Sequence, residues 1–278
     1  MKIAFFGTDE FSINVISELI TNDIKIDLII TVPDAPKGRG LVLTPPPIKD
    51  FSSDKGIEII QPEKLDDDCF EKLSSESWDL FIVASYGKII PERFLKIPKS
   101  GVLNVHPSLL PKYRGTSPIE SQIMSGDKNI GVTIMQMDKE MDHGPILAER
   151  KVEYKEYFSE ELYKILSTLG GKIISEILPD YISGKLTGVE QNHDLATFTK
   201  KIKKEDGEVS LTEEDDVIYR KYRALKQSVG LYFYTIRRGN KIRGKINEAE
   251  FKDVKGELKE VTPEGGKRMS YESFLLGL

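Results

Sequence analysis

The chain has 278 residues, a formal net charge of −5 and a hydrophobic content of 39%, enough for one large domain or for a large and a small one. The lone Cys69 argues against a disulfide scaffold or a cysteine-built zinc site and indicates a reducing compartment. No stretch approaches the roughly 18–20 apolar residues of a membrane span, and the opening apolar run is too short for a signal peptide. We therefore expect a cytoplasmic protein without membrane contact.

Short apolar segments alternate with helical patterns along the first half of the chain. This alternation predicts an α/β fold with a Rossmann-like, doubly wound and mostly parallel sheet. Gly7 stands without the G-x-G-x-x-G pattern, so we predict no dinucleotide site. The strands are expected at residues 3–7, 26–32, 58–60, 80–85, 102–106 and 132–137. The helices are expected near residues 11–20, 47–55, 66–73 and 117–125.

The segment at residues 33–40, PDAPKGRG, combines two prolines, two glycines and the cations Lys37 and Arg39, and three more prolines follow at 45–47. This composition predicts an extended, mobile loop on the surface. From the composition alone, an ordinary surface loop and a loop that binds a partner are equally good interpretations.

The most informative segment is NVHPSLLPKYRG at residues 104–115, which ends an apolar run. Residues two apart on a strand point to the same face, so Asn104 and His106 should project together, and Pro107 should end the strand. Parallel α/β sheets bind their ligands at the carboxyl ends of the strands. We expect Asp142, in the turn after strand 132–137, to converge there and to partner His106. Asp138 is the competing carboxylate.

The second part of the chain has a different organisation. Residues 159–182 predict a long amphipathic helix that closes the first domain, with a break at Gly170-Gly171. We interpret the polar segment that follows it as a linker. Beyond the linker, a helix at 215–227 and strands at 231–237, 241–247 and 258–261 predict a small β-rich domain. The expected organisation is a catalytic domain at 1–184, a linker at 185–206 and a small domain at 207–278.

Positive charge is concentrated in one part of the sequence. Residues 217–245 contain nine Lys or Arg and no Asp or Glu, and Tyr232 and Tyr234 lie among them. A lysine cluster at 200–204 precedes this segment. Clustered cations beside aromatic side chains are typical of a nucleic-acid surface. A solvated strand face above a tyrosine-rich core is the alternative interpretation.

Two motifs resemble a known family. NVHPSLLPKYRG together with GVTIMQMDKEMDHGPIL at 131–147 is similar to the signature of the 10-formyltetrahydrofolate-dependent formyltransferases. The resemblance implies that Asn104, His106 and Asp142 are catalytic and that 10-formyltetrahydrofolate is the formyl donor. It also implies a folate site formed by Ser108, Leu109, Leu110, Pro111, Tyr86, Gly87 and Ile89.

Within that family, three segments resemble the methionyl-tRNA branch: the opening KIAFFGT, the PKGRG loop, and KKIKKEDGE at 200–208. They imply an aminoacylated initiator tRNA as acceptor, bound by the loop and by an OB-like carboxyl-terminal domain. The chain departs from the branch at Leu41-Val42, where a lysine pair often follows the loop, and at 250–261, which is shortened. The barrel is therefore expected to be incomplete. The implied tRNA contacts are Lys37, Arg39, Lys201, Arg237, Arg238, Lys241 and Arg243.

Two other functions remain open. Amino-sugar nucleotide formyltransferases share these motifs and also carry small β-rich tails, whereas the glycinamide ribonucleotide enzyme generally lacks a second domain. An RNA-binding protein on a retired enzyme fold would need a damaged site, yet Asn104, His106 and Asp142 are all present.

The chemistry expected of the three residues is stabilisation of an oxyanion. An amine that attacks a formyl carbonyl generates a tetrahedral oxyanion, to which the Asn104 amide and a protonated His106 would donate. Asp142 would favour the imidazolium and help to move the proton lost by the amine. No covalent intermediate is needed. No metal is expected, because the three histidines are widely spaced, and we expect a monomer.

Overall fold

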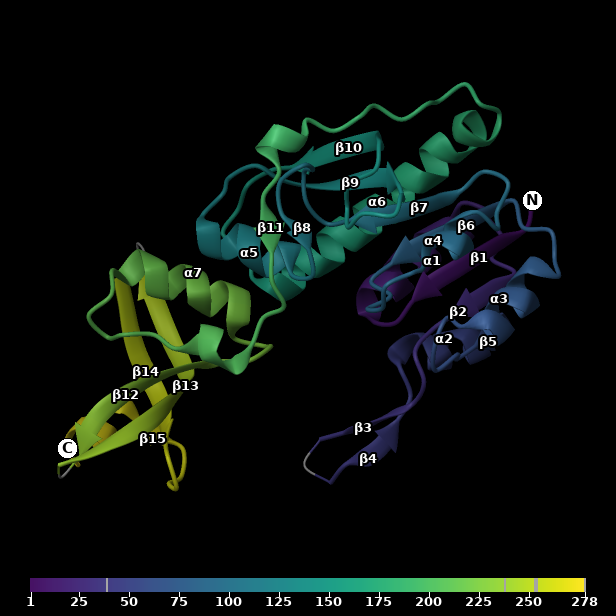
Figure 1. Ribbon diagram of the computed structural model, residues 1–278. Helices are drawn as coiled ribbons and strands as arrows, with labels where there is room; N and C mark the ends of the chain where they lie inside the picture. Colours follow the sequence, from purple (N-terminus) through teal and green to yellow (C-terminus); the bar gives the residue numbers. More distant parts are fainter. Residues whose placement is uncertain (39, 238, 253–254, 278) are drawn as a thin grey trace. The chain divides into compact units, whose positions relative to one another are not determined.

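The computed structural model describes residues 1–38, 40–237, 239–252 and 255–277 (Figure 1). These residues form two compact units. Unit 1 comprises Met1–Thr116, Asn129–Glu153 and Tyr163–Phe198. Unit 2 comprises Ser117–Lys128, Tyr154–Leu162 and the described residues from Thr199 onward. The boundaries expected at 184 and 207 do not coincide with these units, because the segment interpreted as a linker is divided between them.

Unit 1 is built on a seven-stranded sheet in the order β10-β9-β7-β6-β1-β2-β5. The strands from β7 to β5 are parallel to their neighbours, which confirms the mostly parallel α/β sheet. β9 runs antiparallel to β7, and β10, which the sequence did not predict, runs antiparallel to β9. The strands are β1 (Ile3–Gly7), β2 (Leu28–Ile30), β5 (Glu58–Ile60), β6 (Leu80–Ala84), β7 (Val102–His106), β9 (Ile130–Gln136) and β10 (Ile146–Val152).

Helices cover both faces of this sheet. On one face, α3 and α4 pack in an apolar cluster with Phe6, Phe81 and Val102. On the other face, α6 lies so close to β7 that a Cβ on Gly170 would come within 2.3 Å of Val105 Cγ1. The sheet is therefore doubly wound, as predicted. The helices are α1 (Glu10–Thr21), α2 (Pro47–Lys55), α3 (Asp67–Ser74), α4 (Glu92–Leu95) and α6 (Ser159–Ile182).

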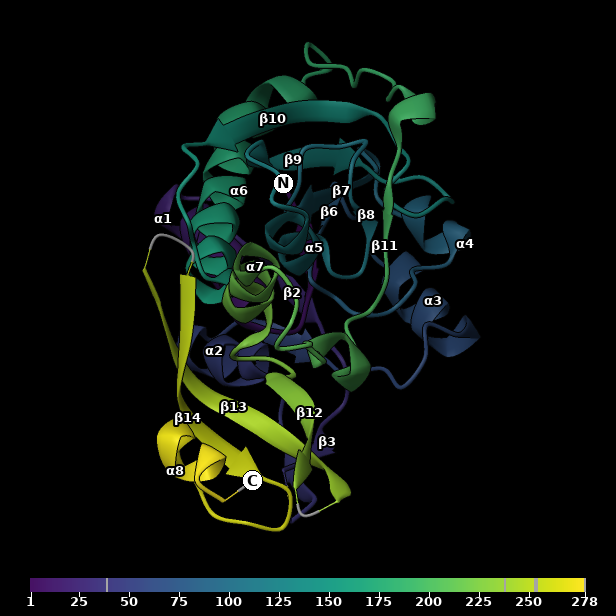
Figure 2. The same ribbon diagram turned by 90° about the vertical axis from the view of Figure 1, so that its left-hand side faces the viewer.

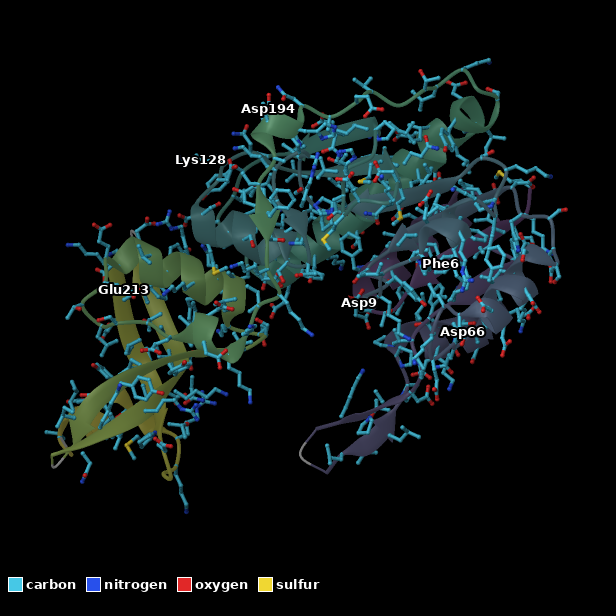
Figure 3. The ribbon with its side chains drawn as sticks, in the orientation of Figure 1. Phe6, Asp9, Asp66, Lys128, Asp194 and Glu213 are labelled. Carbon is cyan, nitrogen blue, oxygen red and sulfur yellow. The ribbon has the colours of Figure 1, made fainter. Side chains whose placement is uncertain are left out.

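The carboxyl ends of β1 and β6 are joined by a small set of hydrogen bonds. Asp9 caps α1, because its Oδ1 accepts the backbone N–H groups of Phe11 and Ser12 at 3.1 and 3.4 Å (Figure 3). The Ser12 hydroxyl donates to the carbonyl of Ala84 at 2.6 Å. A side chain on Gly7 would lie 2.6 Å from Ser12 Cβ, so the glycine permits the close approach of helix and strand.

The break expected at Gly170-Gly171 is wrong, since α6 is continuous. The two glycines serve close packing instead. A Cβ on Gly171 would lie 2.7 Å from the carbonyl oxygen of Val15 in α1. Glycine weakens a helix interior by roughly 0.5–1 kcal/mol relative to alanine. The narrow space between α6, α1 and β7 explains why glycine nevertheless occupies these two positions.

The PKGRG segment forms a hairpin rather than an irregular loop. β3 (Ala35–Lys37) pairs antiparallel with β4 (Val42–Thr44). The hairpin is exposed, as predicted, with Leu41 at 73% and Val42 at 66% of full exposure. Arg39 lies outside the described residues.

Unit 2 contains the predicted β-rich part. Its described strands form an open antiparallel sheet in the order β12-β13-β14-β15, of which β12, β13 and β14 are labelled in Figure 2. Within these residues the sheet does not close into the OB-like barrel of the resemblance, in keeping with the shortened segment. α7 and α8 pack against β14, and α5 packs against α7. The elements are α5 (Pro118–Ser125), α7 (Asp215–Leu225), β12 (Leu231–Arg237), β13 (Asn240–Lys252), β14 (Lys255–Pro263), β15 (Met269–Ser270) and α8 (Tyr271–Leu275).

Two further short strands, β8 (Arg114–Gly115) and β11 (Phe198–Thr199), pair with each other. No helix in the described parts of the chain is long and apolar enough to cross a membrane.

Candidate active site

β7 ends at His106 and carries two of the expected site residues. Val105 faces α6, whereas Val102 belongs to the cluster on the opposite face. Because side chains alternate along a strand, Asn104 and His106 project on the same face as Val102. His106 is only 3% exposed, and Asn104 is half-buried. The two side chains thus point the same way, as their spacing predicts.

Asp142 reaches this pair by a route that the sequence did not predict. Because β9 is antiparallel to β7, its carboxyl end lies beside the start of β7, with Gln136 opposite Leu103. The expectation of a shared carboxyl edge was therefore wrong for Asp142, and the loop between β9 and β10 folds back instead. Gly144 permits this return, since a Cβ there would lie 2.0 Å from the carbonyl oxygen of Gln136.

The three side chains meet at Oδ1 of Asp142. Asn104 Nδ2 lies 3.4 Å from this oxygen, and His106 Nδ1 lies 3.6 Å from it. The other carboxylate oxygen, Oδ2, accepts the backbone N–H of Gly115 at 2.7 Å. The competing carboxylate, Asp138, instead places its Oδ2 2.6 Å from Nδ1 of His143. The structure therefore brings together Asn104, His106 and Asp142 and leaves Asp138 outside the group.

The hydrogen-bond partner of His106 fixes its tautomer. Nε2 lies 3.0 Å from the carbonyl oxygen of Tyr113. A carbonyl can only accept, so Nε2 carries a proton. Nδ1 is then the nitrogen that gains or releases a proton, and it faces Asp142. Tyr113 is held in turn by Thr197, whose Oγ1 accepts its N–H at 2.8 Å.

Four of the expected folate residues form the turn after β7. Ser108 is fully buried, and its hydroxyl donates to the carbonyl of Lys112 at 2.7 Å. Leu110 is only 4% exposed, whereas Leu109 and Pro111 are half-buried. The side chains of Ser108 and Leu110 therefore shape the turn, and the backbone N–H groups of both residues are also bonded within the protein, to the carbonyl of His106 and to Thr133 Oγ1.

The other three expected folate residues follow β6. The ring of Tyr86 packs edge-on against Phe6 with 5.3 Å between the centroids, and burial raises the pKa of its phenol. Gly87 has a φ of 77°, in the left-handed region, and Ile89 is 83% exposed. Ile89 is thus the one side chain of this trio that is open to solvent.

Sequence reasoning missed two buried residues behind Asp142. Gln191 is 5% exposed and Arg114 is 3% exposed. The amide of Gln191 donates to the carbonyls of Asp142 and Gly144 at 2.9 and 2.7 Å, and Arg114 donates to Gln191 Oε1 at 2.6 Å. Arg114 belongs to the NVHPSLLPKYRG motif, and this position could have indicated that it is part of the site. Gln191 lies 77 positions further along, in the segment interpreted as a linker.

The expected tRNA residues of β13 lie beside tyrosines of β12. Lys241 Nζ is 4.2 Å from the ring centre of Tyr234, and the guanidinium of Arg243 is 5.4 Å from that of Tyr232. Both distances are within the range of cation–π attraction. One exposed face of the sheet therefore alternates cations and aromatic rings.

The remaining expected tRNA residues are more scattered. Lys37 in β3 and Lys201 are exposed. Arg237 ends β12. Arg39 and Arg238 lie outside the described residues.

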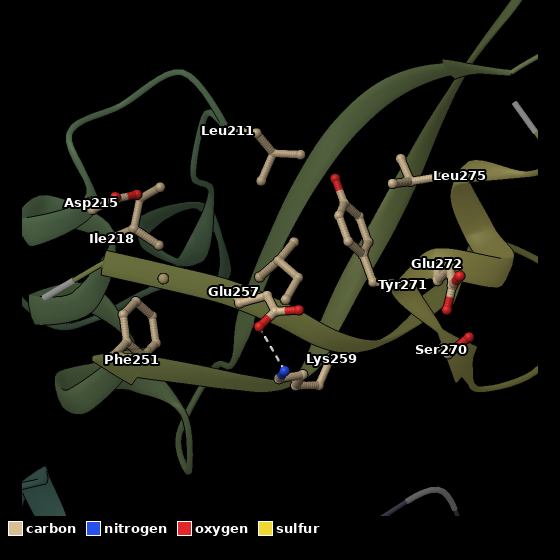
Figure 4. Close-up of a pocket in the computed structure, with 12 residues that line it drawn as sticks. Leu211, Asp215, Ile218, Phe251, Glu257, Lys259, Ser270, Tyr271, Glu272 and Leu275 are labelled. Atoms are coloured by element: carbon tan, nitrogen blue, oxygen red, sulfur yellow. Dashed lines mark hydrogen bonds and ion pairs between the residues drawn. The ribbon is translucent and has the colours of Figure 1, made fainter. Parts of the chain in front are cut away.

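A pocket of about 610 Å³ lies in unit 2 and is lined by none of the expected site residues (Figure 4). Leu211, Ile218 and Phe251 give it apolar walls. At its edge, Lys259 pairs with Glu257 at 2.7 Å, and the hydrogen bonds with Glu257 and then Glu250 raise the pKa of Lys259. Among the described residues, no group of three or more His, Cys, Asp or Glu side chains is arranged to hold a metal ion.

Comparison with known proteins identifies the family. A family model described as formyl transferase matches residues 1–178. The chain is 37% identical to the methionyl-tRNA formyltransferase of Carboxydothermus hydrogenoformans and 38% identical to that of Dictyoglomus turgidum. Both alignments cover 100% of this chain and 96% of the relative.

Solved structures share the fold. Methionyl-tRNA formyltransferase from Clostridium thermocellum matches with a TM-score of 0.64 at 19% identity, over 97% of this chain and 99% of that one. An N-formyltransferase from Helicobacter canadensis, in complex with folinic acid and dTDP-3-aminofucose, matches with a TM-score of 0.66 at 16% identity, over 97% and 98%. The chain belongs to the formyl transferase family and, within it, to the methionyl-tRNA formyltransferases.

Proposed function

We propose that this chain transfers the formyl group of 10-formyltetrahydrofolate to the free amino group of methionyl-initiator tRNA, in the cytoplasm and as a monomer, for translation initiation. The observation that carries the proposal is the meeting of Asn104, His106 and Asp142 at one carboxylate oxygen. The acceptor is supported by relatives named methionyl-tRNA formyltransferase at 34–40% identity.

The transfer exchanges one carbon–nitrogen bond for another. The amino nitrogen of the methionyl group attacks the formyl carbon, and the resulting tetrahedral oxyanion collapses with cleavage of the bond to N10 of the folate. The Asn104 amide is the neutral donor to this oxyanion. Its contact with Asp142, at 3.4 Å, is at the long end of the hydrogen-bond range, so the amide can exchange it for the oxyanion at little cost.

The proton released by the attacking amine has a path through Asp142, while His106 remains protonated. With Nε2 held by Tyr113, protonation of His106 occurs at Nδ1 and yields a charged donor beside the reacting carbonyl. The carboxylate of Asp142, 3.6 Å away, stabilises that imidazolium and accepts the amine proton. The proton then passes to N10 of the departing tetrahydrofolate, which completes the balance.

The family uses formyl-tetrahydrofolate donors, and two loops of this chain fit such a ligand. β6 and β7 are parallel neighbours, with Val83 opposite Asn104. The loops that follow them, residues 86–89 and 108–111, therefore leave the same edge of the sheet beside the catalytic side chains. We place the folate between these loops, beside the exposed Ile89 and the half-buried Leu109 and Pro111, because Ser108 and Leu110 turn their side chains inward.

The tRNA would be held chiefly through unit 2 and the β3–β4 hairpin. Lys241 and Arg243 offer cations to phosphates, and Tyr232 and Tyr234 beside them offer rings on which bases can stack. Lys201, Arg237 and Arg238 extend this basic surface in the sequence. Lys37 and Arg39 would contact the acceptor end.

The deciding experiment offers the enzyme two acceptors. Labelled 10-formyltetrahydrofolate is incubated with charged initiator tRNA or with an amino-sugar nucleotide, and the labelled product is counted. We expect label in the tRNA alone, and none when Asn104→Ala replaces the wild type. Label in the sugar nucleotide but not in the tRNA would establish the sugar formyltransferase alternative, and binding of RNA without any transfer would establish the non-catalytic one.

A further inference from the structure

We propose that Gln191 is a positioning residue for Asp142, and that residues 188–193, the clamp segment, hold the turn at 142–146 in its active conformation. This inference rests on the proposed function, in which Asp142 takes part in formyl transfer. It gives a segment that follows the catalytic α/β core a direct part in assembling the active site.

All hydrogen-bonding positions of the Gln191 side chain are used. The two hydrogens of Nε2 go to the carbonyls of Asp142 at 2.9 Å and Gly144 at 2.7 Å. Oε1 accepts from Arg114 Nη2 at 2.6 Å and Nε at 3.2 Å. Because a guanidinium only donates and a carbonyl only accepts, these partners fix which way the amide points. At 5% exposure, the amide is shielded from competing water.

Three more contacts keep the clamp segment against the turn. Val189 and Ile146 exchange two backbone hydrogen bonds, each of 2.8 Å. The rings of His193 and His143 stack with 4.0 Å between their centroids and 2° between their planes. A Cβ on Gly188 would lie 2.7 Å from Pro145 Cβ. The clamp segment therefore follows the turn along its length, and Gln191 bonds the first and the central residue of that turn.

The backbone of Asp142 needs such support. Its φ is 50°, in the left-handed region that side chains other than glycine adopt at a cost. Its carboxylate must at once face His106 and accept the N–H of Gly115 at 2.7 Å. If the turn relaxed toward an ordinary conformation, the carboxylate would leave both partners. The two bonds from Gln191 oppose that relaxation.

Gln191→Glu tests this role with almost no change in shape. The carboxylate keeps the contact with Arg114 but loses both donors, and it repels the carbonyls of Asp142 and Gly144. We expect kcat to fall ~10–100-fold, as for a small misplacement of a catalytic group, with KM for folate and tRNA changed less than about 3-fold, since Gln191 is buried and belongs to neither the proposed folate loops nor the proposed tRNA surface. Lowering the pH should restore part of the lost rate relative to the wild-type profile, because a protonated carboxyl donates to one carbonyl.

Gln122→Glu is the matched control. Gln122 is also a fully buried glutamine whose amide donates to a backbone carbonyl, that of Pro118 at 3.0 Å in its own helix α5, which belongs to unit 2 and not to the unit of Asp142. It should lower the unfolding temperature without lowering kcat. Gly188→Ala is a second, independent probe, because its methyl group must push the clamp segment away from Pro145, and it should lower kcat as Gln191→Glu does.

A readout that needs no turnover separates this inference from the proposed function. Hydrogen exchange at the Gly115 amide reports whether Asp142 stays in place, since that amide donates to Asp142 Oδ2. Gln191→Glu should accelerate this exchange at least about 10-fold while the β1 amides stay protected. Wild-type kcat and unchanged Gly115 exchange in Gln191→Glu would overturn the role of Gln191. Failure of the wild type to formylate tRNA would overturn the proposed function alone.

Discussion

The two oxygens of the Asp142 carboxylate have different tasks. Oδ2 is held by the backbone N–H of Gly115, whereas Oδ1 faces two side chains that can both donate, Asn104 and His106. The first oxygen anchors the group, and the second provides its chemistry. A substitution can therefore change the group at the Oδ1 position while an oxygen still accepts the N–H of Gly115.

Asp142→Asn makes that replacement. The oxygen of the new amide can still accept the N–H of Gly115, but the NH₂ of that amide faces the NH₂ of Asn104. The substitution also removes the negative charge that stabilises the imidazolium of His106. We expect kcat to fall at least ~10²-fold, with an unfolding temperature close to that of the wild type. Steady-state formyl transfer and thermal unfolding measure the two quantities. Asn104→Ala and His106→Ala should lose as much rate, and near-normal turnover in any one would remove that residue from the mechanism.

At this scale, the sequence predicts residues whose chemistry and spacing are both distinctive. Asn104 and His106 are two apart on a strand, and that spacing alone places them on one face. Gln191 could not be found in this way. Its contacts with the turn are with backbone carbonyls, which every residue possesses, so no pattern of residue types indicates Asp142 as its partner 49 positions away.

Among the elements, the contact of α6 with β7 depends on the absence of one methyl group. Gly170→Ala would place a Cβ 2.3 Å from Val105 Cγ1, and overpacking of this kind costs about 1–3 kcal/mol. The higher helix propensity of alanine returns only about 0.5–1 kcal/mol. We therefore expect a net loss of stability, measured as the free energy of unfolding in denaturant.

The matched test is Val105→Ala, alone and combined with Gly170→Ala. Val105→Ala removes the side chain that the new methyl would strike, so the double variant should be more stable than the sum of the single effects by ~1 kcal/mol or more. Simple additivity would mean that α6 moves away from β7 at no cost, contrary to the close packing described above.

Asp79, the residue before β6, carries a carboxylate that makes stability depend on pH. The backbone N–H of Lys2 donates to Asp79 Oδ2 at 2.7 Å, and Lys99 Nζ lies 3.0 Å from Oδ1. The hydrogen bond from the Lys2 backbone N–H, and then the one from the Lys99 side chain, hold the pKa of Asp79 below its usual range. A carboxyl with a lowered pKa stabilises the fold above its unfolded pKa of about 3.9, and this contribution is lost as the pH falls through the folded value.

Asp79→Asn should therefore unfold at a lower temperature than the wild type at pH 7. The difference should shrink toward zero near pH 2, where the wild-type carboxyl is also protonated. Asp54→Asn, at an exposed position of α2, is the control and should follow the wild type at both values. A gap of equal size at pH 7 and pH 2 would show that the ionised form of Asp79 is not what stabilises the start of β6.

Many elements could be predicted from their apolar pattern, including the short β5 and the basic β12, whereas the direction of β9 and the existence of β10 could not. α6 and β7 have the expected bounds, because the spacing of apolar residues in α6 fits a helix and the short apolar run of β7 fits a strand. The direction of β9 was missed because periodicity does not record which way a strand runs. β10 was missed because Glu149, Arg150 and Lys151 are exposed at the sheet edge and do not resemble a core strand.

At the scale of the whole molecule, charge is segregated. The chain has a net charge of −5, yet residues 217–245 contain no carboxylate. A polyanion would be repelled by most of such a chain and attracted to that segment, which contributes orientation as well as affinity. The tyrosines beside Lys241 and Arg243 add a second, salt-insensitive part to the same surface.

The salt dependence of tRNA binding tests this assignment. Each phosphate contact releases counterions, so the logarithm of affinity falls against the logarithm of salt concentration with a slope of about −0.7 to −0.9 per contact. Replacing both Lys241 and Arg243 by Gln should flatten that slope by about 1.5 and raise KM for tRNA. KM for the folate donor should not change, because the proposed folate loops belong to unit 1. Fluorescence titration of labelled tRNA at several salt concentrations gives the slope.

Two lysines of α6 provide the control for loss of charge as such. Lys164 and Lys172 are exposed and lie outside the expected tRNA surface. Replacing both by Gln changes the net charge of the chain by the same amount but removes no predicted phosphate contact, so the slope should stay at its wild-type value. If the two double variants flatten the slope equally, tRNA senses only the overall charge, and the β12–β13 face is not its binding surface. A flatter slope for the Lys241 and Arg243 pair alone would locate the phosphates on that face.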